Sequence, residues 1–213
     1  MSPRPKDAQK PTKAERTKAR IRDCALELFH EKGFDSTSVE EITQAAGLTK
    51  GAFYVHFESK YSLFPAFIDS LDLNYSGHYA SLAAEPDALI ALARFTDIVL
   101  DLLVNRLGTA VLRPLYRAQV AGDVDTEHFV SKERDLFRII RGLLERAQRE
   151  GQIGADLNSE ALTDHYIMTF RCMCFEWCAR GPDFDLKREA YRHFGYLFDG
   201  IRPRLSMAAP PLL

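Results

Sequence analysis

Residues 37–57, TSVEEITQAAGLTKGAFYVHF, contain two short helical patterns separated by only about three residues. This spacing constrains the fold more than any other part of the sequence. Apolar residues of the first pattern fall on one side of a helix: Val39, Ile42, Ala45 and Ala46. Thr37, followed three residues later by Glu40, is the predicted N-cap and capping box of this helix.

The second pattern begins after a glycine turn. Gly47 stands where a turn needs positive φ, and Leu48 returns an apolar side chain to the core. Thr49 is the predicted N-cap of a helix that ends near Phe57, with Phe53 and Phe57 on its inner side. Two short helices joined by such a turn form a helix-turn-helix, whose second helix enters the major groove of DNA.

The outward side of this second helix carries groups suited to DNA. Lys50 can donate to guanine O6 and N7, with Thr49 and Gly51 at the entrance to the groove. Tyr54 and His56 can donate to phosphate oxygens. The alternative is an ordinary helical hairpin with a solvated face, and the agreement of caps, glycine, inward aromatics and outward donors favours a DNA reader.

A longer set of residues resembles the N-terminal domain of TetR-family transcriptional repressors. These are Phe29, Lys32-Gly33-Phe34, Thr37-Ser38-Val39, Ala46-Gly47-Leu48-Thr49-Lys50-Gly51, Phe53-Tyr54-Val55-His56-Phe57 and Ser59-Lys60. The resemblance covers roughly residues 14–65, with Thr43 as a small departure where helix-turn-helix sequences usually carry Ala. It implies that Lys60 contacts a phosphate, and we assign Thr37 the same role.

The expected fold is all-α, with about nine helices. A three-helix DNA-binding domain over residues 12–58 follows a disordered basic tail, residues 1–11, and precedes a ligand-binding and dimerisation domain, residues 59–206. Residues 207–213 form a flexible tail. Residues 1–22 hold eight Lys or Arg and only two acidic residues, whereas the whole chain has a net charge of −2. One end of the molecule is therefore expected to face phosphate.

The body is read as a series of helices. The predicted ranges are 59–84, 85–107, 109–121, 125–150, 159–180 and 185–202. Pro65 lies in the first of these, either as a kink that sets the angle of the DNA reader or as a tolerated proline of the first turns, with the two weighed equally.

The helix predicted at 159–180 is apolar on more than one side, so it must be covered by more than its own bundle. This pattern and the family resemblance both indicate a homodimer through 159–180 and 185–202. A twofold dimer would read a palindromic operator in double-stranded DNA. Arg171, inside the same helix, is interpreted as an ion pair across the dimer interface in preference to an anchor for an anionic ligand.

The family resemblance implies a cavity for a small-molecule effector of unknown identity. The candidate lining residues are Phe95, Tyr116, Arg117, Gln119, Phe137, Tyr166, Phe170 and Trp177. Each of them also fits ordinary core packing, which needs no ligand.

Three cysteines, Cys172, Cys174 and Cys178, carry the main competing hypothesis, a thiol-based redox sensor. Structural packing is preferred, and metal binding is disfavoured because no fourth ligand has suitable spacing. A helical interaction module that does not bind DNA is a further alternative.

No enzyme motif is present, so we expect no catalytic residues, no metal and no cofactor. No apolar run approaches the length of a membrane span and no secretory signal follows Met1, so the sequence predicts a cytoplasmic protein that does not enter a membrane.

Overall fold

The computed structural model describes residues 11–202, which are helical and contain no strand. The predicted tails, residues 1–11 and 207–213, lie outside this range except for Pro11. The α-helices are α1 Lys13–Lys32, α2 Val39–Ala45, α3 Lys50–His56, α4 Leu63–Ala84, α5 Ala88–Leu102, α6 Gly108–Ala121, α7 Glu127–Val130, α8 Asp135–Arg149, α9 Ser159–Arg180 and α10 Leu186–Ile201. The all-α class is confirmed.

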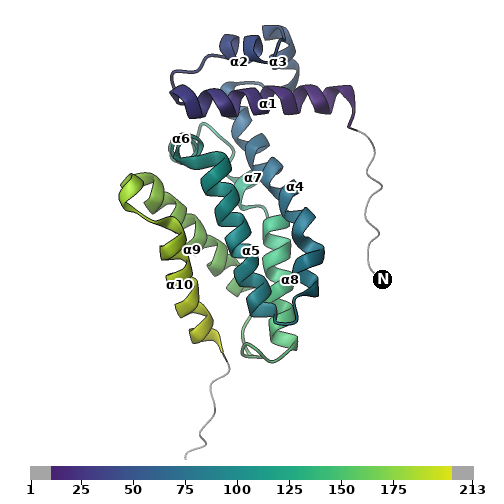
Figure 1. Ribbon diagram of the computed structural model, residues 1–213, viewed down its shortest axis with the longest axis vertical. Coiled ribbons are helices and arrows are strands. Elements are labelled where there is room, and N and C mark those ends of the chain that lie inside the picture. Colours follow the sequence, from purple (N-terminus) through teal and green to yellow (C-terminus); the bar gives the residue numbers. More distant parts are fainter. Residues whose placement is uncertain (1–10, 203–213) are drawn as a thin grey trace, which may run out of the picture.

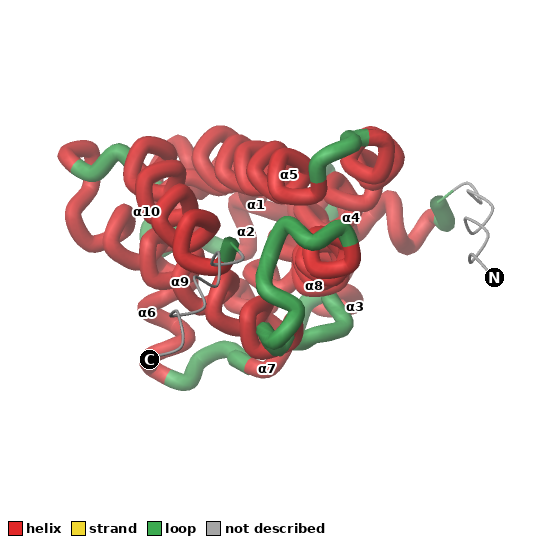
Figure 2. The backbone as a smooth tube through the Cα atoms, turned by 90° about the horizontal axis from the view of Figure 1, so that it is seen from below, coloured by secondary structure: helices red, strands yellow, loops and turns green. Residues whose placement is uncertain are grey.

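The helices form a small head and a longer body. In Figure 1, α1 lies across one end of the molecule with α2 and α3 beside it, and α4 runs from this head into the body. Seen from the opposite end, α9 and α10 lie together on one side of the body, and α4 and α8 on the other (Figure 2). A ring contact between Phe29 of α1 and Phe67 of α4, with centroids 5.9 Å apart, joins the head to the body within one continuous core.

Local sequence signals define the start of the head. Thr12 and Glu15 form the predicted capping box of α1, and the Gly33 amide bonds to the Phe29 carbonyl at the end of that helix. The predicted cap of α2 is wrong by one residue. Ser38, not Thr37, is the N-cap, and the reciprocal carboxylate belongs to Glu41.

Pro65 is the third residue of α4, which follows a 3₁₀ turn at Lys60–Ser62. An amide at this position would have no acceptor within the α-helix, so proline removes no helical hydrogen bond. The structure therefore favours a tolerated first-turn proline and gives no reason for a kink there.

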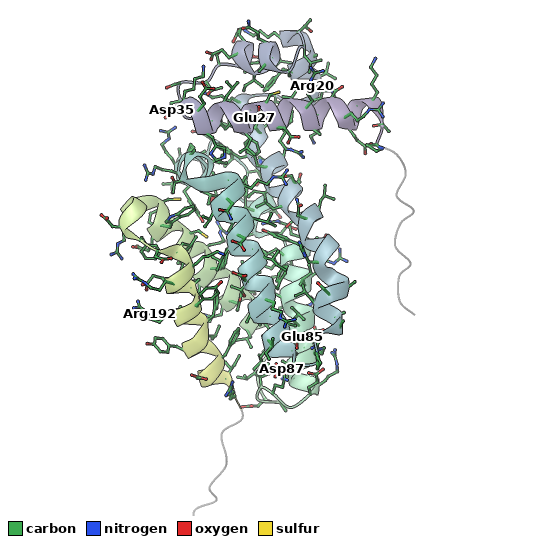
Figure 3. The ribbon with its side chains drawn as sticks, viewed as in Figure 1. Arg20, Glu27, Asp35, Glu85, Asp87 and Arg192 are labelled. Carbon is green, nitrogen blue, oxygen red and sulfur yellow. The ribbon has the colours of Figure 1, made fainter. Side chains whose placement is uncertain are left out.

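The body differs from the expected helices at two points. Figure 3 shows Glu85 and Asp87 at the end of the body that lies far from the head, and Asp87 caps α5 by accepting from the Leu89 and Ile90 amides at 2.8 and 3.0 Å. The helix expected to start at 85–86 thus begins at Ala88. Further on, a π-helical turn, Leu103–Leu107, connects α5 to α6.

The single helix predicted at 125–150 is wrong, because the chain breaks between α7 and α8. Arg134, in the break, has extended backbone, and its guanidinium forms two hydrogen bonds with Asp72 of α4 at 2.8 and 3.0 Å. A third bond joins Arg134 to the Phe129 carbonyl at 3.0 Å. Docking onto α4 thus interrupts the helix that local periodicity predicts.

The last two helices match the predicted ranges closely. Asn158 caps α9 and Asp185 caps α10. Tyr166 of α9 stacks on Phe194 of α10 with ring centroids 4.1 Å apart. None of the helices described here has both the length and the apolar character required to cross a bilayer.

Candidate DNA interface and effector cavity

The turn between α2 and α3 fixes the orientation of α3. Gly47 has φ 60, and a Cβ there would stand 3.0 Å from the Arg20 guanidinium. The Leu48 amide then bonds to the Thr43 carbonyl at 2.8 Å. The Thr49 hydroxyl accepts from the Ala52 amide, as expected for the cap of α3. These local contacts present one side of a seven-residue helix to solvent.

Phe53 and Phe57 are buried beneath α3, as the sequence predicts. Thr49, Lys50 and Gly51 are exposed, and so is Tyr54. His56 is half-buried and so less exposed than the other four candidates, because it lies nearer the inner side of the helix.

Val55 is the outward residue that the sequence reasoning missed. Its side chain is 78% exposed, more than that of Tyr54. The signal was available, because Val55 follows the buried Phe53 by two residues and therefore points about 200° away from it on a helix. Gly51, four residues earlier, shares this outermost line. An exposed valine there offers an apolar contact of the kind that thymine methyl groups accept.

Lys50 forms an ion pair with Glu40 of α2 in this structure. The pair raises the pKa of Lys50 and lowers that of Glu40. Both side chains are more than half exposed, so water screens the attraction and the lysine is free to exchange this partner for another acceptor.

Lys60 ties the start of the body to the loop between α1 and α2. Its ammonium donates to the Phe34 and Thr37 carbonyls at 2.5 and 2.7 Å and lies 4.2 Å from the centre of the Phe34 ring. Desolvation by the surrounding protein lowers its pKa. Since an ammonium has three donors, one remains for a phosphate.

Thr37 is wrongly predicted as a phosphate contact. Its side chain is 1% exposed, and its hydroxyl donates to the Gly33 carbonyl at 2.8 Å. The hydroxyl is therefore used inside the turn between α1 and α2 and does not reach the surface.

An inner cavity of about 70 Å³ lies within the body between α4, α5, α6 and α9. Three of the predicted ligand residues line it, namely Tyr116, Gln119 and Phe170. Phe95 and Tyr166 line a smaller neighbouring space of about 10 Å³, and the Tyr166 hydroxyl bonds to that of Thr96.

An outer groove of about 730 Å³ opens on the other side of Tyr116. Phe137, another predicted ligand residue, lines this groove together with the exposed Met168 and Phe175 of α9. Tyr116, Ile167 and Arg171 border both the groove and the inner cavity.

Arg117 and Trp177 do not line either space. Trp177 is partly buried against the core. Arg117 points the other way from Tyr116 and forms two hydrogen bonds with Asp35, at 2.6 and 2.9 Å, in the loop between α1 and α2. Figure 3 shows Asp35 at the end of the head that lies nearest α6. The prediction that Arg117 lines the cavity is therefore wrong, and the residue instead links the body to the head.

The cysteines are poorly arranged for thiol chemistry. Cys174 and Cys178 are buried. Burial raises the pKa of Cys174 far above its usual range and that of Cys178 to about 11, which disfavours the reactive thiolate. Cys172 is exposed but faces away from these two thiols. The redox reading is thus not favoured. Within residues 11–202, no group of three or more His, Cys, Asp or Glu side chains is placed to hold a metal ion.

Comparisons with known proteins agree with this architecture. Residues 21–67 match the family described as bacterial regulatory proteins, tetR family. The HTH-type transcriptional repressor KstR2 of Rhodococcus jostii is 26% identical over 94% of this chain and 98% of its own. The HTH-type transcriptional regulator AcrR of Shigella flexneri is 26% identical over 87% of this chain and 89% of its own.

A solved structure has the same fold over most of the chain. The TetR-family repressor FadR of Thermus thermophilus, in complex with lauroyl-CoA, superposes with a TM-score of 0.70 over 90% of this chain and 98% of its own, at 21% identity. A head with a helix-turn-helix and a helical body is the architecture expected of such DNA-binding transcriptional regulators. Residues 21–67 thus match the DNA-binding domain of the TetR family, and the relatives that match most of the chain are transcriptional regulators.

Proposed function

We propose that the protein is a dimeric repressor that binds a palindromic operator through α3 and is released by a small-molecule effector. The observation that carries this proposal is that two neighbouring residues of α6 contact two different parts of the molecule. Tyr116 borders the cavity, and the next residue, Arg117, is bonded to Asp35 in the head. One helix therefore contacts both the proposed effector site and the DNA-binding head.

On the DNA, Lys50 reads a base after leaving Glu40, while Thr49 and Gly51 allow close approach. Tyr54, His56 and the remaining donor of Lys60 bind phosphates. The exposure of the α3 residues supports these roles. Half or more of protein–DNA hydrogen bonds go to the backbone, so this balance of one base reader and several phosphate donors is an ordinary one.

The dimer uses α9 and α10. Support comes from the aromatic side chains that α10 leaves exposed, with Tyr191 at 49% and Tyr196 at 70%. On α9 two small residues, Ala161 and Ala179, are exposed along one line of the helix, which lets a second helix approach closely. Twofold symmetry would present two copies of α3 to successive major grooves, roughly 34–36 Å apart.

Effector release acts through the contacts of α6 with α1. Besides the Arg117–Asp35 pair, the His30 ring bonds to the Arg106 carbonyl at 2.8 Å just before α6. A Cβ at Gly108, the first residue of α6, would lie 3.3 Å from that ring. Because these contacts hold the start of α6 close against α1, a ligand that moves α6 also moves the head. The lauroyl-CoA complex of the Thermus thermophilus relative supports an effector site in this body.

The test is selection from a randomised double-stranded DNA library, followed by sequencing of the bound fraction. We expect a palindrome with half-sites about one helical turn apart. Lys50→Ala is then expected to reduce discrimination between matched and mismatched sites roughly 10- to 100-fold. Lys60→Ala is expected to weaken binding to all sequences and to lower the salt slope by about one.

Two outcomes contradict this proposal. Recovery of no enriched sequence would remove the operator-binding role, and enrichment of a single, unrepeated half-site would remove the dimer. An equal loss of discrimination in both lysine variants would show that the roles of Lys50 and Lys60 are assigned wrongly.

A further inference from the structure

The inner cavity contains two arginines in otherwise apolar or neutral surroundings, and only one of them is neutralised. Arg134 pairs with Asp72 through two hydrogen bonds, and the two side chains are only 12% and 14% exposed. Arg171 is half-buried on α9. Among the described residues its guanidinium has neither a hydrogen bond nor an ion pair, and only its backbone carbonyl accepts, from the Tyr116 hydroxyl at 3.2 Å.

The other charged side chains at the outer groove are Lys132, Asp164 and Glu176. Lys132 is neutralised by two carboxylates, Glu160 at 2.7 Å and Asp164 at 3.0 Å. Glu176 lies five residues after Arg171 on α9, is exposed, and makes no ion pair with it. Arg171 is therefore the cation at this groove that has no partner within residues 11–202.

The position of Arg171 favours the ligand anchor over the ion pair across the dimer interface. It stands beside Tyr116 and Ile167, at the junction between the outer groove and the inner cavity. The exposed line of Ala161 and Ala179, which we assign to the dimer surface, lies about 80° further around α9. Arg171 thus borders both cavities and lies at the edge of the proposed dimer surface.

Apolar side chains form much of the wall around Arg171. Phe137, Met168 and Phe175 line the groove, and the inner cavity beyond Tyr116 is lined mainly by aliphatic side chains. Ligand sites in proteins are commonly about 300–1,000 Å³, mostly apolar, with a few polar groups that orient the ligand. The volume of about 730 Å³ falls within that range.

We propose that the effector is an amphipathic organic carboxylate, whose carboxylate binds the Arg171 guanidinium and whose apolar part lies along Phe137, Met168 and Phe175. A guanidinium matches a carboxylate in two parallel hydrogen bonds, and these are stronger than neutral ones. A neutral molecule of the same shape would leave the cation unpaired. This inference rests on the proposed function, because it names the class of effector for the same site.

Calorimetric titration of the full chain tests the proposal with two anions, octanoate and 4-phenylbutyrate, and with their neutral alcohols, octan-1-ol and 4-phenylbutan-1-ol. We expect at least one anion to bind roughly 10- to 100-fold more tightly than its alcohol. Arg171→Gln removes this preference, and Arg171→Lys keeps part of it. Lys132→Gln is the matched control, because its charge lines the same groove but is already neutralised. Circular dichroism verifies that each variant is folded.

Equal affinity for acid and alcohol, undiminished anion binding by Arg171→Gln, or no saturable binding of either anion would overturn the proposal. Operator binding measured in parallel separates this failure from failure of the proposed function. An anion that binds through Arg171 without releasing DNA leaves the site in place and removes its role as an effector site. A protein that binds no operator at all removes the regulatory proposal, whatever the calorimetry gives.

Discussion

The ion pair that breaks the predicted helix gives the sharpest stability prediction. Replacing Arg134 with Met keeps much of the side-chain volume but removes the charge and three hydrogen bonds, two to Asp72 and one to the Phe129 carbonyl. Asp72 is then left as a carboxylate with 14% of its side chain exposed and its main counter-ion gone.

The magnitude follows from this burial. Removing one partner of a buried pair costs about 3–5 kcal/mol, because the other charge stays desolvated. Partial exposure of both side chains and a further interaction of Asp72 favour the lower end, about 3 kcal/mol. For a chain of this length, each kcal/mol shifts the melting temperature by about 2–4 °C, so the expected loss is roughly 6–12 °C.

Thermal and urea unfolding followed by circular dichroism at one fixed protein concentration measure the loss, since the stability of the proposed dimer would depend on concentration. Arg141→Met is the control, because Arg141 pairs with Glu145 at 3.5 Å on the same helix with both side chains about half exposed. It should cost less than about 1 kcal/mol. The double variant Arg134→Met with Asp72→Leu should recover part of the loss. Equal losses in Arg134→Met and Arg141→Met would refute the argument from burial.

Three smaller perturbations test the head and the core. Ser38→Ala should destabilise the protein by about 1 kcal/mol in urea unfolding, whereas an unchanged midpoint would mean that Ser38 is not the cap of α2. Lys32 and Ser38 lower the pKa of Glu41 from 4.5 to about 2, so its contribution to stability is present above pH 4.5 and is lost as the pH falls toward 2. Glu41→Gln should therefore weaken the dependence of the free energy of unfolding on pH between about pH 2 and 4.5, and an unchanged slope would contradict the assignment. Tyr166→Phe removes one buried hydrogen bond but keeps the ring stacked on Phe194, so we expect a loss of about 1 kcal/mol, and a loss as large as that of Arg134→Met would contradict this reasoning.

Much of the head was predictable, because its signals are local. The caps at Thr12 and Thr49 and the turn at Gly47 depend on residues within a few positions of one another. The ends of α9 and α10 were predictable for the same reason. Even here the cap of α2 was assigned one residue too early. A sequence with Thr37 and Ser38 side by side offers two caps, and the choice depends on the Gly33 carbonyl, which draws the Thr37 hydroxyl inward.

The cavity was predictable only in part. Tyr116, Gln119 and Phe170 border the inner cavity, and Phe137 borders the outer groove. Arg117, the neighbour of Tyr116 in sequence, was assigned to the same site. On a helix, however, neighbours point about 100° apart, and the packing of α6 between α1 and α9 decides which of the two faces the cavity.

The sequence by itself determined the three helices of the head, the caps of α1 and α3 and the outward donors of α3, because these depend on spacing and on side chains that act over one or two turns. Tertiary structure alone decided the break at Arg134, the carbonyl partners of Lys60 and the unpaired position of Arg171. Each of these depends on groups that lie far apart in the sequence. Arg134 meets Asp72 of α4, and Lys60 meets the Phe34 and Thr37 carbonyls. The position of Arg171 depends on which charges the packing of the helices brings near it. Helical periodicity contains no information about which distant carboxylate will meet a given arginine, and that meeting is what separates a neutralised charge from one available to a ligand.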